Sequence, residues 1–215
     1  MQRVFAEEDR HGLDEDQVMV LGELAARVRE LIEAAVMTDI ELDEAEAVTA
    51  EVAALTQRLR AARRAEPPVA DLDGHGMVRQ LASPVIGKLN PIAPPIDIEA
   101  LPDGTARTSY TLSPVYEGPP GYVHGGVSAM VLDHLLGCAA MLNGTPGMTA
   151  SLSLSYRRPT PHGVPLIAEA KVVRVEGRKT YVDGRILGPD GRTTVEASAM
   201  FITPQRWFSG TAGPR

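Results

Sequence analysis

The feature that most constrains this chain is one long apolar helix pattern that begins at a pair of glycines. From Gly126 to Leu142 apolar residues recur at steps of three and four, and Asn143-Gly144 stands where a helix would end. His124-Gly125-Gly126 precedes the pattern, and Asp133 follows nine residues after the histidine. The motif therefore places two glycines at a helix start and a carboxylate on the same helix.

Strand-like runs lie on both sides of this helix. They cover residues 96–101, 105–112, 148–156, 166–175, 180–187 and 193–202, and turn-forming residues separate them. In the run 148–156, Leu152, Leu154 and Tyr156 alternate with serines, which predicts one buried face. Two strands, one helix and then four strands predict an α+β fold in which an antiparallel sheet surrounds one central helix.

The N-terminal part of the chain has a different character. Residues 14–35 and 42–64 carry helical apolar spacing, and the short connection between them predicts an antiparallel helical hairpin. Residues 1–70 hold 16 acidic and 8 basic side chains, a net charge of −8, which argues against a DNA or RNA partner. The apolar stripe of the hairpin must be covered by something.

We therefore divide the chain into four segments. These are a helical hairpin over 1–70, a proline- and glycine-rich irregular connector over 71–97, the main domain over 98–205, and a tail over 206–215.

The amino-acid composition indicates which classes of protein this chain can belong to. A hydrophobic content of 44% is enough for a real core. Cys138 is the single cysteine, so no intrachain disulfide can form, and this fits a reducing compartment. We expect a cytoplasmic protein, because the N-terminus lacks a signal-peptide pattern and no run approaches the ~20 apolar residues that span a bilayer. No metal is expected, since no His, Cys or acidic residues stand at metal-ligand spacing, and no cofactor is expected either.

The glycine pair and the carboxylate together suggest which groups could act on a substrate. Backbone N–H groups at a helix N-terminus stabilise an oxygen that gains negative charge. A carboxylate two and a half turns further along can hold a water or act as a base. The combination predicts hydrolysis of an acyl compound.

The pattern resembles the hot-dog-fold acyl-CoA thioesterases, in which His-Gly-Gly-x6-Asp stands at the head of the one long helix with four strands after it. The similarity is to the phenylacetic-acid-pathway (PaaI-like) group and to the branch of thioesterase superfamily members 4 and 5. The segments Glu117–Gly126 and Thr149–Pro161 resemble that branch, and the resemblance covers roughly residues 80–203. It implies the hot-dog fold, preceded here by the N-terminal hairpin.

The resemblance also implies roles for site residues. Asp133 activates the attacking water or attacks the thioester itself, and it faces a partner subunit across a homodimer formed through the sheet, with a tetramer left open. Gly125 and Gly126 supply amides to the thioester oxygen, His124 orients the loop or the water, and Thr149 holds the water. The alternatives are a solvated helix aspartate, a plain glycine turn, a structural or proton-carrying histidine, and an ordinary strand threonine.

Four cations are candidates for the coenzyme A phosphates, with ordinary surface charge as the alternative: Arg157, Arg158, Arg178 and Lys179. His134 and Cys138 are expected to pack within the helix environment. One position departs from the family. Relatives near the PaaI group have an asparagine six residues before the histidine, whereas this chain has Gly118, so a donor to the substrate carbonyl is lost.

The sequence thus favours an enzyme that converts acyl-CoA and water to a free acid and coenzyme A. The alternative is a hot-dog protein that binds acyl-CoA without turnover, as a regulator or partner. An enoyl-CoA hydratase of the same fold is disfavoured, because Asn90-Pro91 is followed by Ile92-Ala93 without the histidine of such enzymes.

Overall fold

The computed structural model of the chain describes residues 12–72 and 77–205. The expected tail over 206–215 and the first eleven residues lie outside the described part. The chain divides into two compact units. The first runs to Ser83 and includes Gly87–Pro91, and the second comprises Pro84–Ile86 and the chain from Ile92 onward.

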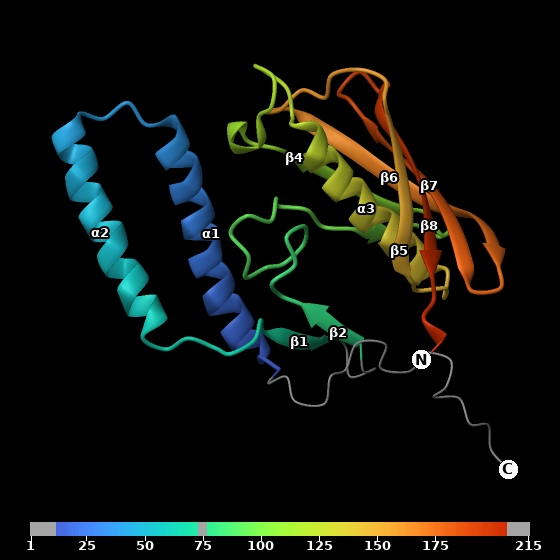
Figure 1. The fold of residues 1–215 in the computed structure, drawn as a ribbon, viewed down its shortest axis with the longest axis horizontal. Helices are drawn as coiled ribbons and strands as arrows, with labels where there is room; N and C mark the ends of the chain where they lie inside the picture. Colours follow the sequence, from blue (N-terminus) through green and yellow to red (C-terminus); the bar gives the residue numbers. More distant parts are fainter. Residues whose placement is uncertain (1–11, 73–76, 206–215) are drawn as a thin grey trace, which may run out of the picture. The chain divides into compact units, whose positions relative to one another are not determined.

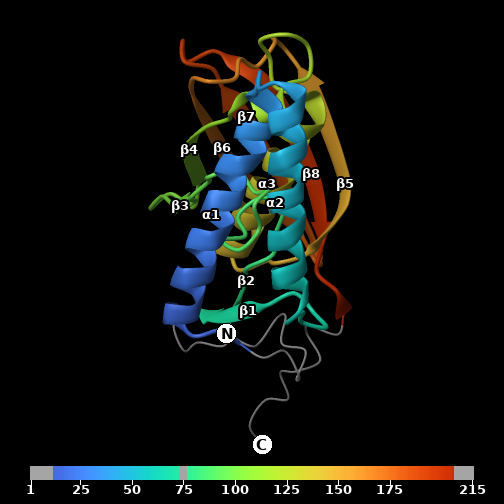
Figure 2. The same cartoon turned by 90° about the vertical axis from the view of Figure 1, so that its left-hand side faces the viewer.

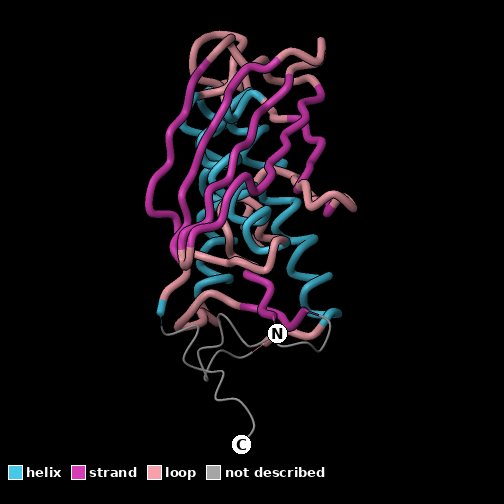
Figure 3. The backbone as a smooth tube through the Cα atoms, turned by 90° about the vertical axis from the view of Figure 1, so that its right-hand side faces the viewer, coloured by secondary structure: helices cyan, strands magenta, loops and turns pink. Residues whose placement is uncertain are grey.

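The second unit is built on a six-stranded sheet. Its strands are β3 (Glu99–Ala100), β4 (Ala106–Thr111), β5 (Met148–Tyr156), β6 (Pro165–Glu176), β7 (Lys179–Leu187) and β8 (Thr193–Ile202). They lie in the order β3-β4-β6-β7-β8-β5, and every neighbouring pair is antiparallel. Figure 3 shows the long strands of this sheet side by side. The strand that follows the helix in sequence therefore forms one edge of the sheet.

The long helix α3 (Gly125–Leu142) packs on one face of this sheet (Figure 1). Leu132, Leu135 and Leu136 are almost fully buried, and they meet the inward-facing residues of β6, β7 and β8 in one apolar core. The helix ends at Asn143, and Gly144 takes the positive φ of 76° that a helix stop favours. The predicted α+β hot-dog arrangement is confirmed.

By length and composition α3 would also suffice to cross a membrane, and no other helix in the described ranges 12–72 and 77–205 would. Seven of its residues are buried within the protein, as in the core helix of a globular domain.

The first unit contains α1 (Glu15–Met37), α2 (Leu42–Arg60), β1 (Val69–Leu72) and β2 (Met77–Gln80). Asp14 caps α1, since its carboxylate accepts the Gln17 amide at 2.8 Å while the Gln17 side chain accepts the Asp14 amide. Leu13, Val18 and Leu81 are buried in a small separate core. Figures 1 and 2 show α1 and α2 running in opposite directions.

Three sequence expectations need correction. The connector 71–97 is not irregular throughout, because β1 and β2 pair as an antiparallel hairpin whose four-residue strands are too short to show an alternating pattern. The strand expected over 96–101 reduces to Glu99–Ala100. The second helix ends at Arg60 and not at residue 64. The expected strands 148–156 and 193–202 match β5 and β8.

Candidate active site

The start of α3 is capped by the side chain of its own preceding histidine. His124 Nδ1 accepts the Gly126 amide at 3.0 Å, which requires the tautomer with the proton on Nε2. The His124 carbonyl accepts the amides of Val127 and Ser128 at 2.9 and 3.3 Å. Among the described residues, the Gly125 amide is thus the one N–H of this first turn without a partner. An anionic oxygen at this position would meet that amide and the positive end of the helix.

Tyr156 holds the first peptide of the helix from the end of β5. Its hydroxyl donates to the Gly125 carbonyl at 2.9 Å. A Cβ on residue 125 would stand only 3.3 Å from the tyrosine ring and hydroxyl, so the absence of a side chain lets the two elements approach. Leu152 and Leu154 are half-buried, but Tyr156 is 56% exposed, so the predicted buried face is wrong for the tyrosine, which contacts the helix start instead.

The loop before the helix leaves no room for a side chain at Gly118. A Cβ there would lie 2.8 Å from the His124 Cα. The Gly118 amide donates to the Tyr122 carbonyl at 2.9 Å, and the His124 amide donates to the Tyr116 carbonyl at the same distance. An asparagine at position 118 would therefore force this loop to shift.

Asp133 and Thr149 lie together. Thr149 Oγ1 donates to Asp133 Oδ1 at 3.0 Å, and the carboxylate is half-buried while the threonine is exposed. The contact depends on a β-bulge, because the register between β5 and β8 shifts between Thr149 and Ser151. Thr149 is thereby opposite Phe201 and turned towards α3, although simple alternation from Leu152 would turn it away.

Within one chain the two parts of the site are far apart. Gly125 and Asp133 are separated by eight residues of helix, which corresponds to about 12 Å along the axis. A single reacting carbonyl group cannot be within hydrogen-bond distance of both. The candidate residues therefore fall into two groups, which we call half-sites: one at the helix start beside Tyr156 and one at Asp133 beside Thr149.

The four candidate cations form two separate pairs. Arg157 binds Glu196 at 2.8 Å, and Arg158 donates to the Thr193 carbonyl at 3.1 Å. Arg178 donates to the Thr203 carbonyl at 3.3 Å, next to Lys179 at the start of β7. Tyr156, which precedes Arg157, lies opposite Val195 near the start of β8, whereas Lys179 lies opposite Ile202 at the end of β8. The two pairs of cations are therefore at opposite ends of the strands.

His134 and Cys138 lie on α3 away from these contacts. Burial lowers the pKa of His134, against the opposing charge of Asp133, and the His134 Nε2 atom has no partner in the described part of the chain. Burial raises the pKa of the Cys138 thiol to about 11, so the thiol is protonated at neutral pH. The residues that the structure describes include no group of three or more potential metal ligands.

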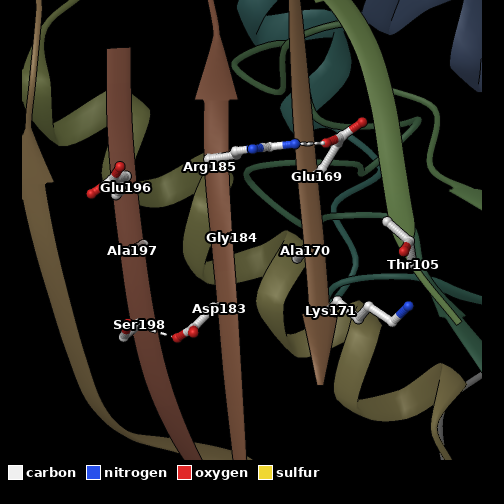
Figure 4. A pocket seen from close by; sticks show the side chains of 10 residues that line it. All are labelled: Thr105, Glu169, Ala170, Lys171, Asp183, Gly184, Arg185, Glu196, Ala197 and Ser198. Carbon is white, nitrogen blue, oxygen red and sulfur yellow. Dashed lines mark hydrogen bonds and ion pairs between the residues drawn. The ribbon is translucent and has the colours of Figure 1, made fainter. Parts of the chain in front are cut away.

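A groove of about 400 Å³ lies on the sheet face turned away from α3 (Figure 4). Its charged side chains have partners: Arg185 binds Glu169 at 3.1 Å, and Ser198 donates to Asp183 at 2.7 Å. None of the half-site residues lines this groove.

The chain is similar to known thioesterases in sequence and in fold. A solved thioesterase superfamily protein is 36% identical to this chain with a TM-score of 0.76, and the match covers 90% of this chain and 97% of the other. This chain belongs to the thioesterase superfamily. The family model of that name matches residues 120–195, the segment that includes both half-sites.

Curated relatives are similar to part of this superfamily member. Acyl-coenzyme A thioesterase THEM4 of Xenopus laevis is 39% identical over 90 residues, which cover 41% of this chain and 40% of that protein. THEM4 of Mus musculus is 37% identical over 87 residues, covering 40% and 37% of the two chains. The match thus spans about two fifths of the length of these relatives.

A side-chain contact that the sequence did not reveal links the loop before α3 to His162. Glu117 accepts the Gly121 amide at 2.9 Å and lies 2.7 Å from His162 Nε2. The Gly121 amide, followed by the His162 side chain, holds the pKa of the Glu117 carboxyl below its ordinary value. A carboxylate with a lowered pKa stabilises the fold above its ordinary pKa and loses this contribution as pH falls through the folded value.

We predict that His162→Ala raises the pKa of Glu117 part of the way to its ordinary value, since the Gly121 amide remains. A carboxyl-detected NMR titration measures this directly. Lys171→Ala is the matched control: it removes a 2.7 Å ion pair with Asp103, whose pKa is lowered to about 2, and leaves Glu117 unchanged. An unchanged Glu117 titration in His162→Ala would show that the contact does not anchor the loop.

Proposed function

We propose that this chain hydrolyses acyl-CoA thioesters to a free acid and coenzyme A. The observation that carries the proposal is the hydrogen bond from Thr149 to Asp133, on the helix whose start is capped by His124. Membership of the thioesterase superfamily and the similarity to THEM4 acyl-CoA thioesterases support the same reaction class.

The proposed chemistry begins at Asp133. Because Thr149 donates its proton to the carboxylate, its oxygen lone pairs are open to accept a hydrogen bond from a water. Asp133 removes a proton from this water as the water oxygen attacks the thioester carbonyl carbon. The oxyanion that forms accepts the Gly125 amide, and Gly126 supports it by fixing the cap with His124. The C–S bond then breaks, and the departing thiolate of coenzyme A takes the proton from Asp133.

The two half-sites complete each other in a homodimer formed through the sheet. β5 is an edge strand, so the β5 strands of two copies can pair with each other. If they pair antiparallel with their middle residues opposite each other, Thr149 of one copy lies beside Tyr156 of the second copy. Asp133 of one chain then meets the Gly125 amide of the other. This arrangement resolves the separation of about 12 Å within one chain.

The same pairing brings the four cations together. Arg157 and Arg158 follow the end of β5. Lys179 lies opposite Ile202 of β8, and Ile202 also lies opposite the first residue of β5. Antiparallel β5 strands therefore place Arg178 and Lys179 of one copy near Arg157 and Arg158 of the other. We propose that these side chains bind the phosphates of coenzyme A, which attract long cations at exposed positions.

Binding of acyl-CoA without turnover is the second candidate. Two observations favour it: the Gly126 amide is already bonded to His124, and position 118 cannot hold an asparagine donor without a loop shift. Loss of such donors weakens stabilisation of the oxyanion, which matters more for turnover than for binding.

Substitution of Asp133 separates the two candidates. We expect thiol release from a panel of short, medium, long and aromatic acyl-CoAs to fall by about 10²- to 10⁴-fold in Asp133→Asn, the usual contribution of a general base. Binding of acyl-CoA should persist, because the amide has the same shape. Turnover that survives in Asp133→Asn would contradict the role of this carboxylate, and a wild type that binds every substrate without turnover would establish the binding protein.

A matched pair of variants tests the Gly125 amide. Gly125→Pro removes the N–H at the first helical position, where proline is well tolerated, and adds the proline ring; we expect kcat to fall by about 10²- to 10³-fold. Gly125→Ala keeps the N–H and introduces the same Cβ 3.3 Å from Tyr156, so it controls for crowding. Steady-state kinetics with equal losses in both variants would exclude the amide as the oxyanion donor.

A further inference from the structure

The helix α2 presents an apolar stripe that the first unit leaves largely exposed, with Ala45 and Val48 half-buried. None of its residues is buried. Apolar residues recur at steps of three and four along one side, at positions 45, 48, 52, 55 and 59. Val52, Leu55 and Leu59 are 36%, 50% and 55% exposed. This is the spacing by which one helix packs along another.

The neighbouring helix α1 has two apolar faces. Val18 and Ala25 are buried in the small core of the first unit. Leu21 packs against the same core, whereas a second stripe follows Leu24, Val28 and Leu31, again at steps of four and three, and Leu24 and Leu31 are each 40% exposed. The hairpin therefore exposes apolar side chains on both of its helices, and exposed stripes of this kind mark interaction surfaces.

The charges of α2 favour a second copy of the same helix as the partner. Its first half is acidic and its second half is basic. The acidic residues are Asp43, Glu44, Glu46 and Glu51, and the basic residues are Arg58 and Arg60. Two α2 helices in parallel would bring like charges together. In an antiparallel pair the acidic half of each lies beside the basic half of the other.

The apolar stripe is self-complementary in that antiparallel arrangement. When Val52 of one copy lies opposite Leu55 of the second copy, Val48 lies opposite Leu59. In the same register Glu51 stands next to Arg58 of the second copy, at the flank of the seam.

We propose that the α1–α2 hairpin is a self-association surface, in which α2 packs antiparallel against α2 of a second copy and the exposed stripe of α1 completes a four-helix contact. This surface is separate from the β5 edge, and the inference does not rest on the proposed reaction. It gives the chain a second way to recognise another copy of itself.

Disulfide trapping tests the contact in the full-length chain. The variant Val52→Cys with Leu55→Cys places thiols on the stripe, and mild oxidation at low micromolar concentration should convert most of it to a covalent dimer on a non-reducing gel. Cys138 is half-buried with a raised pKa, so it does not interfere. Ala47→Cys with Ala50→Cys is the matched control, since these exposed positions have the same spacing on the opposite side of α2.

The proposal is supported if the stripe variant forms the covalent dimer and the control forms at least tenfold less of it. A stripe variant that stays monomeric on the gel, or that links no faster than the control, would overturn it.

Hydrogen exchange provides a readout without cysteines. Amides of α2 in the wild type should become more protected as concentration rises, and Leu55→Glu with Leu59→Glu should abolish this dependence. Both positions are exposed, so the charges do not disturb a core. Exchange of α2 that is independent of concentration in the wild type would contradict self-association.

Discussion

Burial of one face of α3 against the six-stranded sheet determines where every proposed functional group lies. Leu132, Leu135 and Leu136 fix the rotation of the helix, because each is almost fully buried. Asp133 is one step from Leu132 and so points about 100° away from the centre of the buried face. This direction leads to the β5 edge, where the threonine hydroxyl meets the carboxylate. The helix start is fixed by the same packing and by its histidine cap.

Sequence patterns predicted the elements whose signals are local. The helical spacing of α3, and the strand-like runs between turn-forming residues for β5 and β8, predicted the positions of these elements within a residue or two. The bulge in β5 was not visible, and alternation alone would have turned Thr149 away from Asp133. Contacts between distant residues, such as Tyr156 with Gly125 and Glu117 with His162, depend on how the elements pack. No local pattern contains that information.

The two proposals share one feature, because each pairs a surface of this chain with the same surface of a second copy. The helix rise separates Gly125 from Asp133 within one chain, while antiparallel β5 strands would bring them together between two chains. The apolar stripe of α2 and the order of its charges likewise match themselves in an antiparallel pair. In the proposed mechanism the two half-sites act only together, and the edge strand that carries Thr149 is also the proposed interface.

Complementation between two inactive variants tests this central claim most directly. Asp133→Asn and Gly125→Pro are denatured together and refolded as an equal mixture, and thiol release from acyl-CoA is measured. If the half-sites come from different copies, each mixed dimer has one intact site, and the mixture regains about a quarter of wild-type activity. If both groups act within one chain, no mixed dimer has an intact site. A mixture no more active than its two components would therefore contradict the account.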